Sequence, residues 1–307
     1  MRLRQRLLPV ALRLTLDLRP SYTELTEIAL TDTARSPHAA TASGLPLAGA
    51  PAPSATLLEA RDLVVRFGGV VALNGASLTI PRQGITGIVG PNGAGKSTLF
   101  DVLAGVRRPS AGAVHFNGRD ITGAALHRRA HLGIARSFQI ARELDGLSVL
   151  ENVLLASLDH PGDKLWRVFL TPRQVKREEA RLIERALGLL DRVKLRRLAD
   201  EPAGVLSGGQ KKLLELARAL MLDPALVLLD EPAAGVNPLL IDELCAFILT
   251  LKAEGTAFAI VEHNMDVVAA LCDRVYVLAD GAVLTTGTFD EIVADARVMD
   301  AYLGQQA

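Results

Sequence analysis

Several features are scarce in this sequence of 307 residues. It holds two cysteines, few aromatic residues (4%), and no net charge, because Lys+Arg and Asp+Glu each number 34. Two cysteines exclude a disulfide framework, and each stands in an apolar helical pattern typical of a small core residue. Balanced charge excludes a global field that favours nucleic acid. No apolar run approaches the roughly 18 residues of a membrane helix, so we expect no segment that spans a bilayer.

The first segment, residues 1–54, differs in composition from the rest. Arginines alternate with leucines at its start, and it then becomes rich in Ala, Pro, Thr, Ser and Gly. A secretory signal is rejected because the apolar stretch Leu7–Leu12 contains Pro9 and stops at Arg13. We expect a disordered tail. An amphipathic helix on a membrane surface and an over-extended start remain as alternatives.

Residues 55–304 are predicted to form one α/β domain. Strands are expected at Thr56–Phe67 and Ala76–Pro81 (an antiparallel piece), Gly84–Gly90, Val114–Asn117, Gly133–Gln139, Ala225–Asp230, Thr256–Val261 and Arg274–Leu278. Helices are expected from Lys96, from Lys211 to Leu222, and over Leu239–Ala253 and Asn264–Cys272. Alternation of strands and helices predicts a mainly parallel core sheet. Within this domain, apolar residues at helical spacing predict a helical subdomain at about residues 145–222. One of its helix faces would carry Leu182, Ile183, Ala186, Leu189 and Leu190.

A glycine-rich loop follows the strand Gly84–Gly90. It matches the pattern G-x-x-x-x-G-K-[ST] and consists of Gly90, Pro91, Asn92, Gly93, Ala94, Gly95, Lys96, Ser97 and Thr98. Glycines let the backbone curl so that its N–H groups face phosphates. Lys96 would reach the β and γ phosphates of ATP, and the Ser97 hydroxyl is placed for Mg²⁺.

Two acidic residues follow a second apolar run. Leu226–Leu229 predicts a strand buried on both faces, so Asp230 and Glu231 emerge at its carboxyl end, beside the phosphate loop. Asp230 would hold Mg²⁺, directly or through water, and Glu231 would accept the proton of the attacking water. Taken alone, such a pair is more often a solvated strand end.

The pentapeptide Leu206–Gln210, which precedes the acidic strand, carries the resemblance to a known family. Ser207, Gly208, Gly209 and Gln210 complete the sequence LSGGQ, so the chain resembles the ABC ATPases, a type of P-loop NTPase. Serine and glycines at a helix start make a second anion site. This pentapeptide is the signature sequence of the family. The resemblance implies a head-to-tail dimer in which each ATP is held between the phosphate loop of one subunit and the signature sequence of its partner.

Other positions resemble the family one by one. Gln139 resembles the glutamine that links the γ-phosphate and its Mg²⁺ to the membrane subunit, and His263 resembles the switch histidine that contacts the γ-phosphate. Phe67 lies where the family stacks an aromatic ring on adenine, although a plain core position fits it almost as well. Asn237 is a departure, because the family usually has Asp there; we interpret it as tuning of the dimer interface.

Several segments narrow the resemblance to the larger ATPase subunit of branched-chain amino-acid importers. These are Arg66–Gly69, Arg136–Gln139, Val149–Asn152, Glu231–Pro238, Glu262–Asp266, Gly287–Ile292 and Ala301–Gly304. This branch implies that the chain binds two membrane permeases and a second ATPase subunit or a second copy of itself. An external solute-binding protein would act indirectly, and no nucleic acid would bind. The expected location is peripheral, on the cytoplasmic face of the plasma membrane. Two alternatives stay open, the ATPase of a lipopolysaccharide or lipid exporter and a soluble ABC-type ATPase acting on ribosomes or DNA.

Overall fold

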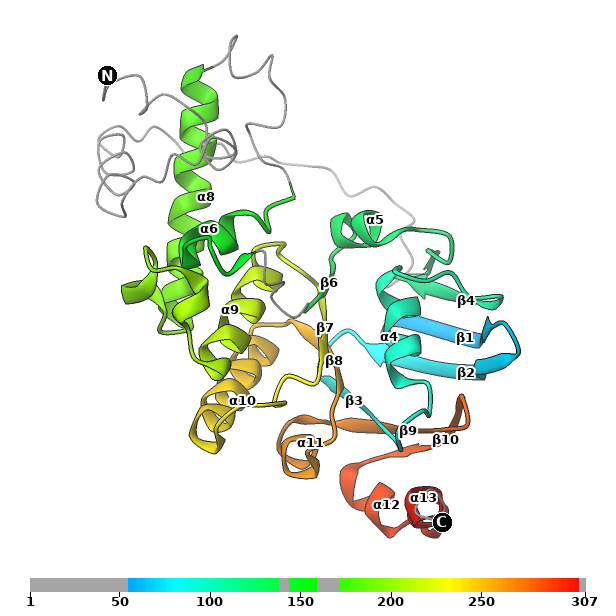
Figure 1. The fold of residues 1–307 in the computed structure, drawn as a ribbon. Helices are drawn as coiled ribbons and strands as arrows, with labels where there is room; N and C mark the ends of the chain where they lie inside the picture. The colour runs from blue at the N-terminus through cyan, green and yellow to red at the C-terminus, as the bar shows by residue number, and fades with distance from the viewer. Residues whose placement is uncertain (1–54, 138–143, 159–171, 304–307) are drawn as a thin grey trace. The chain divides into compact units, whose positions relative to one another are not determined.

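The structure is a computed structural model that describes residues 55–137, 144–158 and 172–303 (Figure 1). The tail predicted at residues 1–54 and the candidate residue Gln139 lie outside the described residues. The described chain divides into two compact units. Residues 55–137 and 222–303 form the sheet unit, and residues 144–158 and 172–221 form the helical unit. No helix among the described residues combines the length and the apolar character needed to span a membrane.

The sheet unit contains a six-stranded sheet with the order β10-β9-β3-β8-β7-β6. Its strands are β3 (Ile85–Val89), β6 (Ile134–Arg136), β7 (Leu226–Asp230), β8 (Ala257–Val261), β9 (Arg274–Ala279) and β10 (Ala282–Gly287). All neighbours are parallel except β10, which runs antiparallel to β9. Residues of β3 and β8 are buried throughout, as expected for strands covered on both faces. The helices of this unit are α4 (Lys96–Ala104), α5 (Leu126–His131), α10 (Pro238–Ala253), α11 (Met265–Leu271), α12 (Phe289–Ala294) and α13 (Ala296–Leu303).

A second, antiparallel sheet of the same unit has the order β2-β1-β4-β5. Its strands are β1 (Thr56–Phe67), β2 (Val70–Pro81), β4 (Ala111–Phe116) and β5 (Arg119–Asp120). The predicted start of β2 at Ala76 is wrong by six residues. Gly68, with a φ of 58°, turns the chain tightly, so Val70 already pairs with Phe67.

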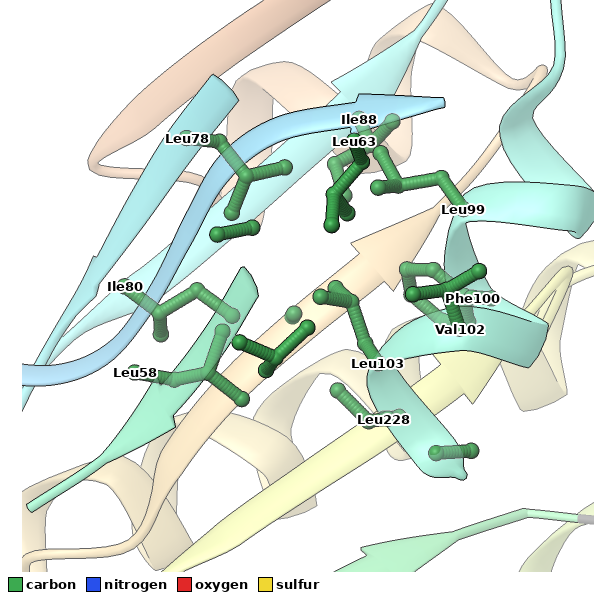
Figure 2. Close-up of a cluster of buried hydrophobic side chains, with 14 of the residues drawn as sticks. Leu58, Leu63, Leu78, Ile80, Ile88, Leu99, Phe100, Val102, Leu103 and Leu228 are labelled. Atoms are coloured by element: carbon green, nitrogen blue, oxygen red, sulfur yellow. The ribbon is translucent and has the colours of Figure 1, made fainter. Parts of the chain in front are cut away.

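Helix α4 packs into the core that the two sheets share. It contacts β2 of one sheet and β6 and β7 of the other. Figure 2 shows the buried side chains that meet there: Leu58, Leu63, Leu78, Ile80, Ile88, Leu99, Phe100, Val102, Leu103 and Leu228. Burial of each such side chain stabilises the fold by about 1.5–3 kcal/mol. The start of α4 is therefore held firmly relative to the end of β3.

A buried arginine closes the other end of α4. Arg129, on α5, is 0% exposed and donates to five backbone carbonyl oxygens, those of Val102, Leu103, Ile121, Thr122 and Ala124. Two of these carbonyls, those of Val102 and Leu103, belong to the last turn of α4, where helical carbonyls lack the usual partner four residues ahead. The Val102 carbonyl also accepts from the N–H of Gly105 at 3.2 Å. Nothing in the sequence pattern set Arg129 apart from the neighbouring basic residues.

The helical unit contains α6 (Val149–Leu154), α8 (Pro172–Arg192) and α9 (Gly208–Leu220), which pack against one another, and two 3₁₀ turns (Arg196–Leu198 and Ala203–Val205). On α8 the predicted apolar face is buried, with Leu182 only partly so. Helix α9 begins at Gly208 and not at the predicted Lys211, because Ser207 caps it. The predicted α/β class, with a mainly parallel sheet, an antiparallel piece and helices between, is confirmed.

Candidate functional site

The glycine-rich loop joins β3 to α4, as predicted, and it needs glycine at defined points. Gly90 has a φ of 149° and Gly95 a φ of 98°, both rarely adopted by other residues. A Cβ atom on Gly90 would lie 2.1 Å from the carbonyl oxygen of Leu278, and one on Gly95 would lie 2.4 Å from that of Ala72. The loop is therefore pressed against neighbouring backbone, which sets its curvature.

The start of α4 presents unpaired donors. Its N-cap is Gly95, and no side chain among the described residues caps the helix. The N–H groups of Lys96, Ser97 and Thr98 precede the first intrahelical donor, Leu99, whose N–H bonds to the Gly95 carbonyl at 2.8 Å. With the positive end of the helix dipole behind them, these groups form an anion site.

Lys96 places its ammonium group inside the curve of the loop. Its Nζ donates to the carbonyl oxygens of Gly90 (2.8 Å) and Pro91 (2.9 Å), and the residue is only 7% exposed. Burial lowers the pKa of Lys96, while the carboxylates of Glu231 and Asp230 oppose that shift. An ammonium has three donors, so one remains for a phosphate oxygen.

Strand β7 delivers the acidic pair to the same edge of the sheet. Since β3, β8 and β7 are parallel neighbours, their carboxyl ends meet there. Asp230 accepts a hydrogen bond from Arg136 (Nη2 to Oδ2, 3.0 Å), and Arg136 also pairs with Asp101 of α4. Sequence reasoning missed the contact of Arg136 with Asp230; the available signal was a charged residue at the carboxyl end of a buried strand.

Glu231 and His263 lie next to each other. Nε2 of His263 is 3.2 Å from Oε1 of Glu231, and both side chains are almost half exposed, at 44% and 45%. Both can therefore reach a solvent molecule or a ligand at this edge. Glu231 also has a φ of 48°, an unusual conformation for a residue other than glycine.

Phe67, at the end of β1, is not a core residue. It is 42% exposed, and the guanidinium carbon of Arg107 lies 4.2 Å from the centre of its ring. This cation–π contact covers part of the ring. The exposure of its ring contradicts the interpretation of Phe67 as a plain core residue.

The signature pentapeptide belongs to the helical unit, and its serine and glutamine cap α9. Ser207 Oγ accepts from the backbone N–H of Gln210 (3.3 Å), and Gln210 Oε1 accepts from that of Ser207 (3.0 Å). This capping box satisfies the N–H of Gln210. The N–H groups of Gly208 and Gly209, at the first two helical positions, have no intrahelical acceptor and can face an anion.

A family model described as ABC transporter matches residues 73–234, more than half of the chain. The chain belongs to the ATP-binding cassette family of ABC transporters. A second model, described as branched-chain amino acid ATP-binding cassette transporter, matches residues 282–307. The predictions of an ABC-type P-loop fold and of an ATPase are thus confirmed.

Curated relatives match the cassette along its length. A probable branched-chain amino acid transport ATP-binding protein, LivG, of Archaeoglobus fulgidus is 40% identical, over 81% of this chain and 96% of the relative. The high-affinity branched-chain amino acid transport ATP-binding protein BraF of Pseudomonas aeruginosa is 37% identical, over 82% and 99%. A crystal structure described as the ADP conformation of an ATP-binding cassette of an ABC transporter is 37% identical, covers 81% of this chain and 99% of that one, and has a TM-score of 0.72.

The oxygen donors of the cassette fit Mg²⁺. Ser97, the second residue of α4, offers a hydroxyl, and Asp230, the last residue of β7, offers a carboxylate. Hydroxyl, carboxylate and phosphate oxygens are the ligands that Mg²⁺ prefers, usually with one or two carboxylates from the protein. In the described part of the chain, no group of three or more His, Cys, Asp or Glu side chains could hold a metal by itself.

Proposed function

We propose that the chain is the ATP-hydrolysing subunit of an ABC importer for branched-chain amino acids or related small polar solutes. The match of residues 282–307 to a model of branched-chain amino acid transporters carries this proposal. The names of the relatives that align with nearly their full length support it. These observations favour the importer over the exporter and the soluble ATPase considered above.

The geometry of the sheet unit suggests the roles of its residues. The loop at residues 90–98 would hold the phosphates of ATP, with the ammonium of Lys96 beside the γ-phosphate. Ser97, Asp230 and Gln139 would hold Mg²⁺, which neutralises charge on the phosphates when bound. Phe67, with its exposed ring, would stack on adenine.

Glu231 and His263 would carry out the hydrolysis. Glu231 accepts a proton from water as the water oxygen bonds to the γ-phosphorus, and the bond from that phosphorus to the β–γ bridging oxygen breaks to give ADP and phosphate. His263, 3.2 Å from Glu231, would hold the γ-phosphate and orient the base. Gln139 would report the γ-phosphate to the membrane subunit.

The N–H groups of Gly208 and Gly209, which have no acceptor within α9, suggest the assembly. Together with Ser207 and Gln210 they would complete the ATP site of a partner, either a second copy or a different ATPase subunit, in a head-to-tail dimer. The dimer would bind transmembrane permease subunits at the cytoplasmic face of the membrane. An external solute-binding protein would select the solute, so the cassette itself would not contact it.

Transport by a reconstituted complex tests this function. The cassette is combined with its permeases in proteoliposomes that enclose ATP and Mg²⁺, and uptake of labelled leucine is measured with the solute-binding protein outside. We expect uptake that depends on ATP and is abolished by Glu231→Gln, while the matched acidic variant Asp290→Asn, exposed on α12, transports normally. Uptake of urea or an amide instead of leucine would change the solute, and ATP-driven export of lipid would refute the importer.

A further inference from the structure

We infer that Glu262 is a positioning residue for ATP hydrolysis, because its carboxylate ties together the backbone segments that carry Glu231 and His263. Glu262 directly follows β8 and is 3% exposed. Its Oε1 accepts from the backbone N–H of Ala233 at 2.7 Å. Its Oε2 accepts from the N–H groups of His263 (2.9 Å) and Asn264 (3.1 Å).

A buried carboxylate is costly unless its oxygens are hydrogen-bonded. Here both oxygens of Glu262 have partners, and the donors lie on two separate segments of the chain, one after β7 and one after β8. Hydrogen bonds to an ionised acceptor are shorter and about twice as strong as neutral ones. The side chain therefore acts as a bracket between the carboxyl ends of two neighbouring strands.

The bracket explains how Glu231 keeps its unusual backbone. Left-handed conformations cost of order 1–3 kcal/mol and persist where surrounding contacts enforce them. On the near side, the N–H of Glu231 bonds to the carbonyl of Val261 at 2.9 Å. On the far side, Ala233 bonds to Glu262. Both contacts lead to the end of β8, so the φ of 48° at Glu231 is held from both directions.

The same carboxylate also fixes His263. Because Glu262 holds the N–H of His263 through one oxygen and the segment after Glu231 through the other, it sets the position of both partners in the 3.2 Å contact between His263 Nε2 and Glu231 Oε1. Without the bracket, each side chain could still reach the γ-phosphate region, but the two would no longer be aligned together. Misplacement of catalytic groups by about 1 Å costs roughly 100-fold in rate.

This inference rests on the roles proposed for Glu231 and His263, and it predicts a particular kinetic signature. The phosphate loop lies between β3 and α4. Among the described residues, Glu262 makes no hydrogen bond to the loop, to β3 or to α4. Loss of the bracket should therefore lower kcat and leave the KM for ATP within about twofold.

The test measures steady-state ATP hydrolysis by the full-length chain in its purified transport complex. Glu262→Gln keeps the size of the side chain, but an amide has one acceptor oxygen, so its NH₂ group faces a backbone N–H on one side of the bracket. We expect kcat to fall about 10-fold in Glu262→Gln and about 100-fold in Glu262→Ala. Glu262→Asp keeps the charge but is shorter, so its loss of kcat should lie between these two values. This variant provides the test if the other two fail to fold.

Two controls separate positioning from general destabilisation. Val268→Ala removes a side chain that is 1% exposed from α11, the helix that follows His263, and should leave kcat within twofold. A double mutant tests coupling: added to His263→Ala, the change Glu262→Gln should lower kcat less than twofold further, because residues that act as a unit are not additive.

Three results would overturn the inference. These are an unchanged kcat in both Glu262→Gln and Glu262→Asp, a rise in KM with unchanged kcat, and independent multiplication of the losses in the double mutant. The proposed roles are checked separately by Glu231→Gln. If Glu231→Gln turns over normally, the proposed base is wrong. If Glu231→Gln loses turnover while Glu262→Gln and Glu262→Asp both turn over normally, only the inference about Glu262 is refuted.

Discussion

Replacement of Arg129 by methionine should be among the most destabilising single changes in the sheet unit. The guanidinium donates five hydrogen bonds, at 2.7–3.3 Å, to backbone carbonyl oxygens. The side chain of Arg129 is fully buried, so these bonds are shielded from water. Burial lowers the pKa of Arg129 to about 10, so the group is still charged at neutral pH. Met fills a similar length but offers no donor.

The magnitude follows from what is lost and what is relieved. Hydrogen bonds to a charged group contribute about 1.5–3 kcal/mol each, and unpaired buried carbonyls add their own desolvation cost. Against this, the cost of burying a charge disappears. The Val102 carbonyl also keeps its bond from the N–H of Gly105. We therefore expect the free energy of unfolding to fall by about 3–5 kcal/mol, a large fraction of the 5–15 kcal/mol typical of a domain.

Urea denaturation followed by circular dichroism measures this change. The matched control is Arg128→Met, the exposed neighbour on α5, which should shift the free energy of unfolding by less than about 0.5 kcal/mol. Arg129→Lys should lie between, since an ammonium can satisfy at most three of the five carbonyls. A loss below about 1 kcal/mol in Arg129→Met would show that the buried arginine does not stabilise the end of α4.

Three further predictions concern single side chains. Lys96→Ala should raise the dissociation constant for ATP by about 10- to 100-fold in a titration, since about 1.5–3 kcal/mol of charge-assisted contact is lost, whereas Lys252→Ala, on α10, should not. Phe67→Ala should weaken ATP binding about 3- to 10-fold and Phe67→Trp should not, as expected for stacking worth about 0.5–1.5 kcal/mol; equal affinities would remove Phe67 from the adenine site. Burial raises the pKa of the Cys272 thiol from 9.0 to about 12. The folded state then holds a proton that the unfolded state releases, so stability is lost as pH rises above 9, by about 1.4 kcal/mol at pH 10. Cys272→Ala should flatten that alkaline limb of a pH–stability curve, and an unchanged limb would contradict the raised pKa.

The local features of this protein could be predicted from its sequence. The phosphate loop occupies consecutive residues, so its sequence predicts its glycines, Lys96 and the start of the helix that follows to within one residue. Buried runs such as Leu226–Leu229 have one structural solution, a strand covered on both faces. Errors arose where a local cap or turn decided a boundary, as with Ser207 before α9 and Gly68 before β2.

Only the tertiary structure decided which distant residues support the site. Arg136 bonds to Asp230 across 94 positions, Ala233 to Glu262 across 29, and Arg129 to Val102 across 27. Hydrophobic periodicity reports which face of an element is buried, but it carries no record of which strand lies beside which. The order β3-β8-β7-β6 brings the carboxyl ends of these strands to one edge, and long-range packing thereby sets the contacts of each charged group. The residues that give the loop its chemistry are adjacent in the sequence and can therefore be recognised there. The alignment of Glu231, Glu262 and His263, by contrast, exists only once the sheet has formed.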